Sequence, residues 1–291
     1  YLTGIFGKET DVNISKRSFQ LFMRLKRTLK ILIRNLLNEF KESEFIPSFF
    51  EMRIDESGAP GTVAPLKFPL PDGSTATIYG IADRVDTCKR GNDVYVRVVD
   101  YKTGKKEFNL SDIALGLNLQ MLIYLFSLWN DGNGSVKNAL NVDGEVIPTG
   151  VLYLKAKLDD IKADADTDPA VIYELAEKSL KRSGLVINDE EILRMMEKKL
   201  SGKYIPVSLK NDGQFTSASI NSLHTLEEFG ALRRSIEDTV IRLATEIKGG
   251  KAECKPLKNK RNDGCKYCPY SAVCRNASAF ESKEDKGKLY G

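Results

Sequence analysis

The chain has 291 residues, of which 42% are hydrophobic and 29% are charged, and its formal net charge is +4 at pH 7. A chain of this length can bury one good core, and the charge is too mild to indicate nucleic-acid binding by itself. No apolar run approaches the roughly 18 residues of a membrane span, and no charged-then-apolar start indicates a signal peptide. We therefore expect a cytoplasmic protein with reduced thiols and no membrane association.

Hydrophobic periodicity predicts the elements of an α/β unit in the first half of the chain. A long helix is expected first, then four strands, a helix and a further strand, over residues 15–40, 46–54, 63–69, 75–86, 94–102, 111–129 and 149–156. Allowing for one extra hairpin strand, this order contains α-β-β-β-α-β. From about residue 168 onward we expect a helical annex, with helices over residues 169–181, 189–201 and 222–248.

Two neighbouring strands carry the first candidate site residues. One is Gly80-Ile-Ala-Asp83-Arg84-Val-Asp86, and the other ends in Asp100-Tyr-Lys102. In a strand with a period of two residues, Asp100 and Lys102 share one face, so a carboxylate and an ammonium lie side by side. The carboxylate can hold a hard divalent cation, and the lysine can orient or activate an attacking water. The alternative is an ordinary strand that ends in exposed charged residues.

Strand parity places Asp83 and Asp86 on opposite faces, so only one of them can share a metal with Asp100 unless a bulge intervenes. Parity alone does not choose between them. Gly80 permits a close approach of another part of the chain at this point.

The apolar helix that follows contains Gln120 and Tyr124, which lie four residues apart and therefore on one helical face. An amide and a phenol in this arrangement can reach a phosphate or a base. The alternative is a core helix with two polar residues at its rim.

Three cysteines near the C-terminus, Cys265, Cys268 and Cys274, lie in a short polar segment. Thiolates at this spacing can bind one zinc ion or an iron–sulfur cluster, and one coordination position is left unassigned. Cys88 and Cys254 lie in unrelated contexts. Basic residues crowd the segment before the cysteines and could neutralise phosphates, or could form a solvated link: Lys248, Lys251, Lys255, Lys258, Lys260 and Arg261. The single histidine, His224, is expected on a helix surface.

Taken in order, these four motifs resemble the RecB-like branch of the PD-(D/E)xK nucleases. Within that branch they are most similar to the C-terminal nuclease domains of AddB (RexB) subunits of bacterial ATP-dependent helicase-nucleases. The resemblance implies a restriction-endonuclease-like core, a mixed central sheet flanked by helices, over residues 1–156. A helical annex would follow over residues 157–246, and a basic segment with a cysteine loop over residues 247–291.

The resemblance also implies roles for the residues. Asp83 and Asp100 would bind Mg²⁺ together with the Tyr101 carbonyl, and Lys102 would be the catalytic lysine. Four further residues would support the site: Glu51, Asp86, Gln120 and Tyr124. Cys265, Cys268 and Cys274 would be ligands of a 4Fe-4S cluster that normally has a fourth, upstream cysteine, so we expect this chain to hold the cluster incompletely.

The function implied is a Mg²⁺-dependent DNA exonuclease for double-strand-break repair and recombination, with DNA and a helicase subunit (AddA or RexA type) as partners. The chain has no Gly-x-x-x-x-Gly-Lys-Ser/Thr phosphate loop, so the motor would lie elsewhere. Family members usually carry an upstream cysteine and an upstream helix with an active-site His or other polar residue. Neither motif is found here, so a catalytically inactive DNA-binding or scaffold domain remains an alternative. The other alternative is a zinc-stapled interaction module that uses Cys265, Cys268, Cys274 and Cys254.

Overall fold

The computed structural model describes residues 16–102, 104, 109–158, 167–251, 253, 256–257, 263–266, 268–271 and 273–274. In this part of the chain one mixed sheet of seven strands has the order β2-β1-β5-β6-β7-β8-β9. Its strands are β1 (Ile46–Ile54), β2 (Thr62–Val63), β5 (Gly80–Arg90), β6 (Asp93–Lys102), β7 (Val146–Lys155), β8 (Ser183–Ile187) and β9 (Leu223–His224). A separate hairpin consists of β3 (Lys67–Pro69) and β4 (Thr75–Thr77).

The centre of the sheet consists of β5, β6 and β7. β5 pairs antiparallel with β1 on one side and with β6 on the other, whereas β6 and β7 are parallel. Parallel neighbours need a crossover connection, and here the crossover contains α3 (Leu110–Ala114), α4 (Gln120–Asn130) and α5 (Ser135–Leu140). The strand ends that bear the candidate residues therefore lie next to the start of this crossover.

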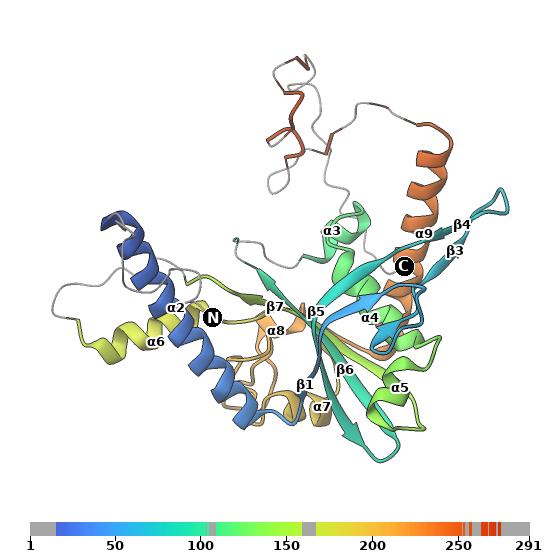
Figure 1. The fold of residues 1–291 in the computed structure, drawn as a ribbon. Coiled ribbons are helices and arrows are strands. Elements are labelled where there is room, and N and C mark those ends of the chain that lie inside the picture. The colour runs from blue at the N-terminus through green and yellow to red at the C-terminus, as the bar shows by residue number, and fades with distance from the viewer. Residues whose placement is uncertain are drawn as a thin grey trace.

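Helices cover both faces of the sheet (Figure 1). On one side lie α2 (Lys16–Glu42) and α6 (Pro169–Ser179), and on the other lie α4, α5 and α9 (Leu226–Lys248). All residues from 121 to 128 of α4 are buried, because this helix packs against β6 and β7 and also contacts α9. Short helices α7 (Glu190–Met196) and α8 (Ser217–Ile220) lie in the later part of the chain.

No helix in the described part of the chain is long and apolar enough to span a bilayer.

The predicted fold class, an α/β restriction-endonuclease-like core, is confirmed, and the helix predicted over residues 15–40 and the strands predicted over residues 46–54 and 94–102 lie close to α2, β1 and β6. The single strands predicted over residues 63–69 and 75–86 are wrong, because the first is divided into β2 and β3 and the second into β4 and β5, and β3 and β4 belong to the separate hairpin. The single helix predicted over residues 111–129 is wrong. It is divided into α3 and α4 because Gly116 (φ 75°) and Asn118 (φ 58°) adopt left-handed backbone conformations, which end a right-handed helix.

The part of the chain predicted as a helical annex also contains two strands that were not predicted, β8 and β9, which extend the central sheet. β8 has only five residues and contains Gly184 at φ 150°. A Cβ atom at Gly184 would lie within 1.9 Å of the Val151 carbonyl oxygen on β7. The glycine therefore permits the close pairing of the two strands, and a short run with a glycine does not give a clear strand signal.

Candidate active site

The hairpin of β5 and β6 brings Asp83 next to the end of β6. The two strands pair antiparallel, with Arg84 opposite Val99. The backbone N–H of Tyr101 donates a hydrogen bond of 3.0 Å to Oδ2 of Asp83. Since Tyr101 directly follows Asp100, the hairpin places the Asp83 carboxylate against β6 between the two charged residues of the Asp100-Tyr-Lys102 motif.

Asp100 and Lys102 form an ion pair at the end of β6. The Lys102 Nζ atom lies 2.6 Å from Oδ2 of Asp100, whose side chain is 8% exposed, against 26% for that of Lys102. The ammonium also lies 5.4 Å from the centre of the Tyr153 ring, on the neighbouring strand β7. The lysine is thus held between a carboxylate and an aromatic face while part of it stays accessible to solvent.

Tyr153 connects this pair to α3. It is the partner of Asp100 in the parallel register of β6 and β7. Burial raises the pKa of Tyr153, and the negative charges of Asp100 and Asp112 raise it further. The phenol is therefore neutral at physiological pH, and the charge of the buried Asp112, in α3, acts on the same ring as that of Asp100. Sequence analysis did not single out Tyr153 or Asp112.

Gln120 and Tyr124 do meet on one face of α4, as their spacing predicts. The Gln120 amide donates to the Tyr124 hydroxyl (2.9 Å), which also accepts from the backbone N–H of Ile81 (3.3 Å). Gly80 makes this contact possible, because a Cβ atom there would lie 2.3 Å from Cε1 of Tyr124. Gly80 thus accommodates a side chain, not the neighbouring backbone, and the pair connects α4 to the strand that carries Asp83.

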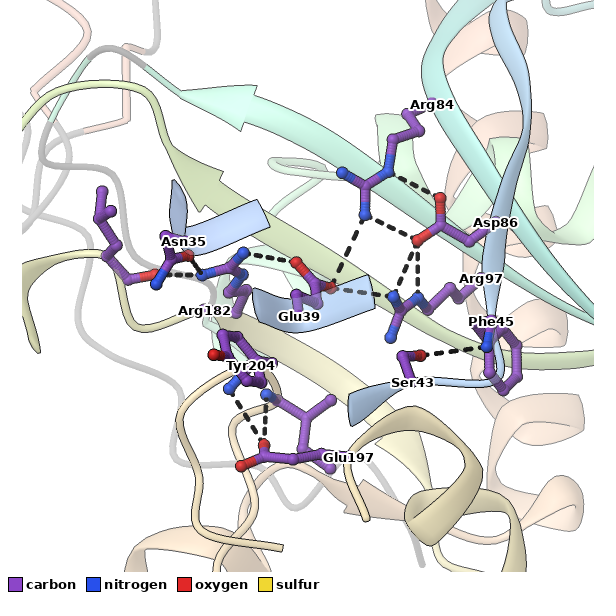
Figure 2. Close-up of polar contacts among 12 residues, drawn as sticks. Asn35, Glu39, Ser43, Phe45, Arg84, Asp86, Arg97, Arg182, Glu197 and Tyr204 are labelled. Atoms are coloured by element: carbon purple, nitrogen blue, oxygen red, sulfur yellow. Dashed lines mark hydrogen bonds and ion pairs between the residues drawn. The ribbon is translucent and has the colours of Figure 1, made fainter. Parts of the chain in front are cut away.

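Asp86 lies in a different environment, a buried cluster of charges on the α2 side of the sheet (Figure 2). Both of its oxygens bind the Arg84 guanidinium at 2.7 Å, and Oδ2 also accepts from Nε of Arg97 at 2.9 Å. Glu39 of α2 pairs with Arg97 (2.9 Å) and with Arg182 (2.5 Å). We call these five residues, which are at most 2% exposed, the buried ion cluster.

The sequence predicted only part of the buried ion cluster. Glu39, Arg97 and Arg182 were not predicted as site residues. One signal was present: Arg97 interrupts the otherwise apolar run of β6, and a lone charge in a buried strand needs a partner. Asp86 is held by arginines in this cluster, whereas Asp83 contacts the backbone of β6, so the two aspartates have different surroundings.

Glu51 has an unusual backbone conformation in β1. Its φ is 50°, in the left-handed region that costs a residue with a Cβ atom about 1 kcal/mol or more. Its neighbours Phe50 and Met52 pair with Arg84 and Ala82, which places Glu51 beside Asp83 in the register. The side chain is exposed.

The cysteines predicted as cluster ligands are free and partly exposed. The backbone N–H of Cys268 donates to the carbonyl of Cys265 (3.2 Å), so these two residues form a turn. Within the described ranges, no three His, Cys, Asp or Glu side chains lie together in a way that would hold a metal ion. Cys254 lies outside the described residues, and Cys88 is buried in the core.

His224 and the basic segment before the cysteines differ from what the sequence predicted. His224 is not on a helix surface; it lies in β9 and is 6% exposed. Lys248 and Lys251 of the basic segment have acidic partners, since Lys248 pairs with Asp72 (2.6 Å) and Lys251 with Glu246 (3.3 Å). The other basic residues of that segment, Lys255, Lys258, Lys260 and Arg261, lie outside the described residues.

Comparisons with known proteins identify the family of this chain. The model of the PD-(D/E)XK nuclease superfamily matches residues 9–275. Similar proteins include the B-type subunit of the ATP-dependent helicase/deoxyribonuclease from Clostridium kluyveri (strain NBRC 12016), which is 35% identical over 266 residues, 91% of this chain and 22% of that protein. The corresponding proteins of Clostridium botulinum (strain Loch Maree / Type A3) and Thermoanaerobacter sp. (strain X514) are 36% and 32% identical, over 92% and 93% of this chain.

The chain spans less than a quarter of the length of these curated relatives, 22% to 23%. The family match covers all of the described residues, including both strands of the β5–β6 hairpin and the helix α4. The chain therefore belongs to the PD-(D/E)XK nuclease superfamily.

Proposed function

We propose that this chain is the Mg²⁺-dependent deoxyribonuclease module of a helicase-nuclease, and that it hydrolyses DNA phosphodiester bonds at Asp83, Asp100 and Lys102. The observation that carries the proposal is the arrangement at the end of β6. There the Asp83 carboxylate is fixed by the Tyr101 N–H, and the Asp100 carboxylate is paired with the Lys102 ammonium. Membership of the nuclease superfamily supports it.

The donor set suits magnesium. Mg²⁺ is usually held by one or two carboxylates and completes its octahedral shell with water and phosphate oxygens. Asp83 and Asp100 provide two carboxylates, and the Tyr101 carbonyl lies on the strand between Asp100 and Lys102. When bound, Mg²⁺ would polarise the scissile phosphate and offset the charge that develops in the transition state.

The side chains of the chain itself then have separate tasks. Lys102 is held by Asp100, so its ammonium is oriented before substrate arrives, and it can donate to the attacking water or to a phosphate oxygen. In the reaction, the water oxygen forms a bond to phosphorus, the bond to one bridging oxygen breaks, and that oxygen leaves with a proton. Tyr124 and Gln120 keep α4 against β5 and so maintain the position of Asp83.

The wider assembly follows from the relatives, which are named as subunits of ATP-dependent helicase/deoxyribonucleases. We propose that this module acts on DNA delivered by a helicase subunit, as an exonuclease in double-strand-break repair and recombination in the cytoplasm. The absence of a phosphate-loop motif from the sequence supports a motor on another part of the assembly.

Cleavage and metal binding test the proposal together. In the intact protein, Asp100→Ala and Asp83→Ala should each abolish Mg²⁺-dependent cleavage of linear DNA and weaken metal binding measured by calorimetry. Glu42→Ala, on the far side of the sheet, is the control and should change neither. If the wild-type protein binds DNA but does not cleave it in Mg²⁺, the module is an inactive DNA-binding scaffold and the nuclease proposal is wrong.

The cysteine segment supports a separate proposal, that Cys265, Cys268 and Cys274 are three ligands of a 4Fe-4S cluster. The support is the chemistry of three free thiols within one short segment and the turn that joins the first two. Because these three thiols are not gathered in the described structure, the cluster would assemble the site as it binds. Iron and sulfide analysis of the intact protein tests this, and Cys268→Ala should remove both; a stoichiometric zinc content would contradict it.

A further inference from the structure

A cavity of about 640 Å³ lies at β8 and β9, and four separate parts of the fold line it. Asn109 and Leu110 contribute the start of α3, and Ser183 and Gly184 the start of β8. The segment from α8 to the first turn of α9 provides most of the remaining wall. We call this cavity the β8–β9 pocket.

The sheet register relates the pocket to the catalytic residues. Asp100 pairs with Tyr153, and Tyr153 pairs with Ser183, so these three residues form a row across β6, β7 and β8. Neighbouring strands lie about 4.8 Å apart, which puts Ser183 about 10 Å from Asp100. That distance corresponds to about three stacked nucleotides of one DNA strand, which rise about 3.4 Å each.

A buried histidine lines this space, and one of its ring nitrogens, itself buried, has no partner among the described residues. His224 lines the pocket and is 94% buried, and its Nδ1 atom has no hydrogen-bond partner in the part of the chain that the structure describes. Burial lowers the pKa of His224, although the Glu228 charge and the backbone of Ser222 oppose this. A neutral imidazole can make a hydrogen bond at Nδ1 as donor or acceptor, and a buried group of this kind without a partner costs about 1–3 kcal/mol.

The lining chemistry narrows the class of ligand. The described lining residues include amides, hydroxyls, the imidazole and the Glu228 carboxylate, but no lysine or arginine. A phosphate is therefore disfavoured, because the only formal charge among these lining residues is negative. Apolar side chains complete the wall, and one of them, Ile220, is 61% exposed although it is large. A nucleobase has an edge that forms hydrogen bonds and a flat face that packs against apolar groups, and this lining offers partners for both.

We propose that the β8–β9 pocket receives an unstacked nucleobase of the DNA strand whose backbone is held at Asp100, about three nucleotides from the scissile phosphate. The inference rests on the proposed function, because it assumes that DNA lies along this end of the sheet. His224 and Glu228 face the base edge. Since Glu228 can only accept when ionised, and its Oε2 already accepts from the Thr225 N–H, the pocket favours bases with an exocyclic amino group over thymine.

The first experiment maps cleavage of single-stranded DNA by the intact protein. Each substrate carries one abasic nucleotide in an adenine-rich strand, and the cleavage frequency is measured at every bond. We expect cleavage to fall about fivefold or more at one fixed offset from the abasic position, the effect expected from losing one base contact. His224→Leu should flatten this minimum, and His224→Asn, which keeps a polar atom near the position of Nδ1, should restore part of it.

A second experiment uses no cleavage at all. The protein is titrated with deoxyadenosine monophosphate and with thymidine monophosphate, and binding is followed by saturation-transfer NMR. We expect a stronger signal for the adenine nucleotide. His224→Leu should remove it, and so should Asn221→Ala, which changes an exposed side chain of the pocket and leaves the fold intact.

The two experiments separate the two proposals. A flat abasic profile in a protein that cleaves DNA normally, together with equal nucleotide signals in wild type and variants, overturns the pocket and leaves the nuclease intact. If the wild-type protein cleaves no DNA, the proposed function is wrong. The nucleotide titration then decides whether the pocket binds a nucleobase. Binding that is lost in both His224→Leu and Asn221→Ala supports it, and binding unchanged in both overturns it.

Discussion

Replacing Asp86 and Asp83 in turn by asparagine should separate stability from metal binding. Asp86 is fully buried and holds two guanidiniums, those of Arg84 and Arg97. Asparagine has the same shape but no charge, so Asp86→Asn leaves both arginines buried with Glu39 as their remaining carboxylate. Breaking a buried ion pair from one side costs about 3–5 kcal/mol. For a chain of this size the melting temperature should fall on the order of 10 °C.

Asp83→Asn should have the opposite outcome. Asp83 is only partly buried, and the hydrogen bond it accepts from Tyr101 can be accepted equally by the asparagine carbonyl. The free energy of unfolding should therefore change by less than about 1 kcal/mol. The loss of a metal-binding carboxylate should nevertheless remove Mg²⁺ binding and DNA cleavage.

Denaturant unfolding followed by circular dichroism and calorimetric titration of Mg²⁺ measure the two effects on the same samples. Wild-type stability in Asp86→Asn would refute the role given to the buried ion cluster. Equal loss of metal binding in both variants would show that both aspartates face the metal, which would require a bulge in β5.

The acid dependence of stability gives a further check on Asp86. Burial would raise the pKa of Asp86, but the charges of Arg97 and Arg84 and their hydrogen bonds outweigh burial, so the pKa lies below the usual 3.8. The carboxylate therefore contributes stability above about pH 4, and this contribution is lost as pH falls through the lowered pKa. Unfolding free energy should drop more steeply below pH 4 in the wild type than in Asp86→Asn.

Two further substitutions have matched controls. Glu39→Gln should cost about 3–5 kcal/mol of stability, because it leaves the buried Arg182 guanidinium without a carboxylate, whereas Glu42→Gln, in the same helix but in a partly exposed 3.8 Å pair, should cost less than about 1 kcal/mol by denaturant unfolding. Gly80→Ala should destabilise the protein by about 1–3 kcal/mol, since its Cβ would lie 2.3 Å from Tyr124, and Gly104→Ala, which meets nothing within 4 Å, should not. Equal effects within either pair would contradict the contacts on which it rests.

The parts of the site that were predictable from sequence depend on local spacing. Asp100 and Lys102 are two residues apart on a strand, and Gln120 and Tyr124 are four apart on a helix, so periodicity alone puts each pair on one face. The hairpin that brings Asp83 to β6 joins consecutive strands, which most often pair with each other.

The buried ion cluster could not be predicted in the same way. Glu39 binds Arg97 and Arg182, which lie 58 and 143 residues away in the sequence. Nothing in the local pattern of α2 distinguishes Glu39 from a solvent-exposed acid on a basic helix. Such partners depend on how the sheet and the helices assemble.

The position of His224 was within reach of sequence analysis. Thr225 and Glu228 form a capping box, with the Thr225 hydroxyl accepting from the Glu228 N–H and the Glu228 carboxylate accepting from the Thr225 N–H. The first residue of a capping box is the N-cap, which comes directly before the helix. Thr225 therefore places His224 outside α9. What the sequence did not show is that the two residues before the cap pair with β8 as β9.

Lys102→Ala in the intact protein tests the central claim most directly. The single-turnover rate of DNA cleavage in saturating Mg²⁺ should fall about a hundredfold or more, since a preorganised charge at the scissile phosphate is lost. DNA affinity should stay close to that of the wild type. Lys155→Ala, which removes the lysine in register with Lys102 on β7, is the control and should cleave at nearly the wild-type rate. Unchanged cleavage in Lys102→Ala would contradict the assignment of the active site to the end of β6.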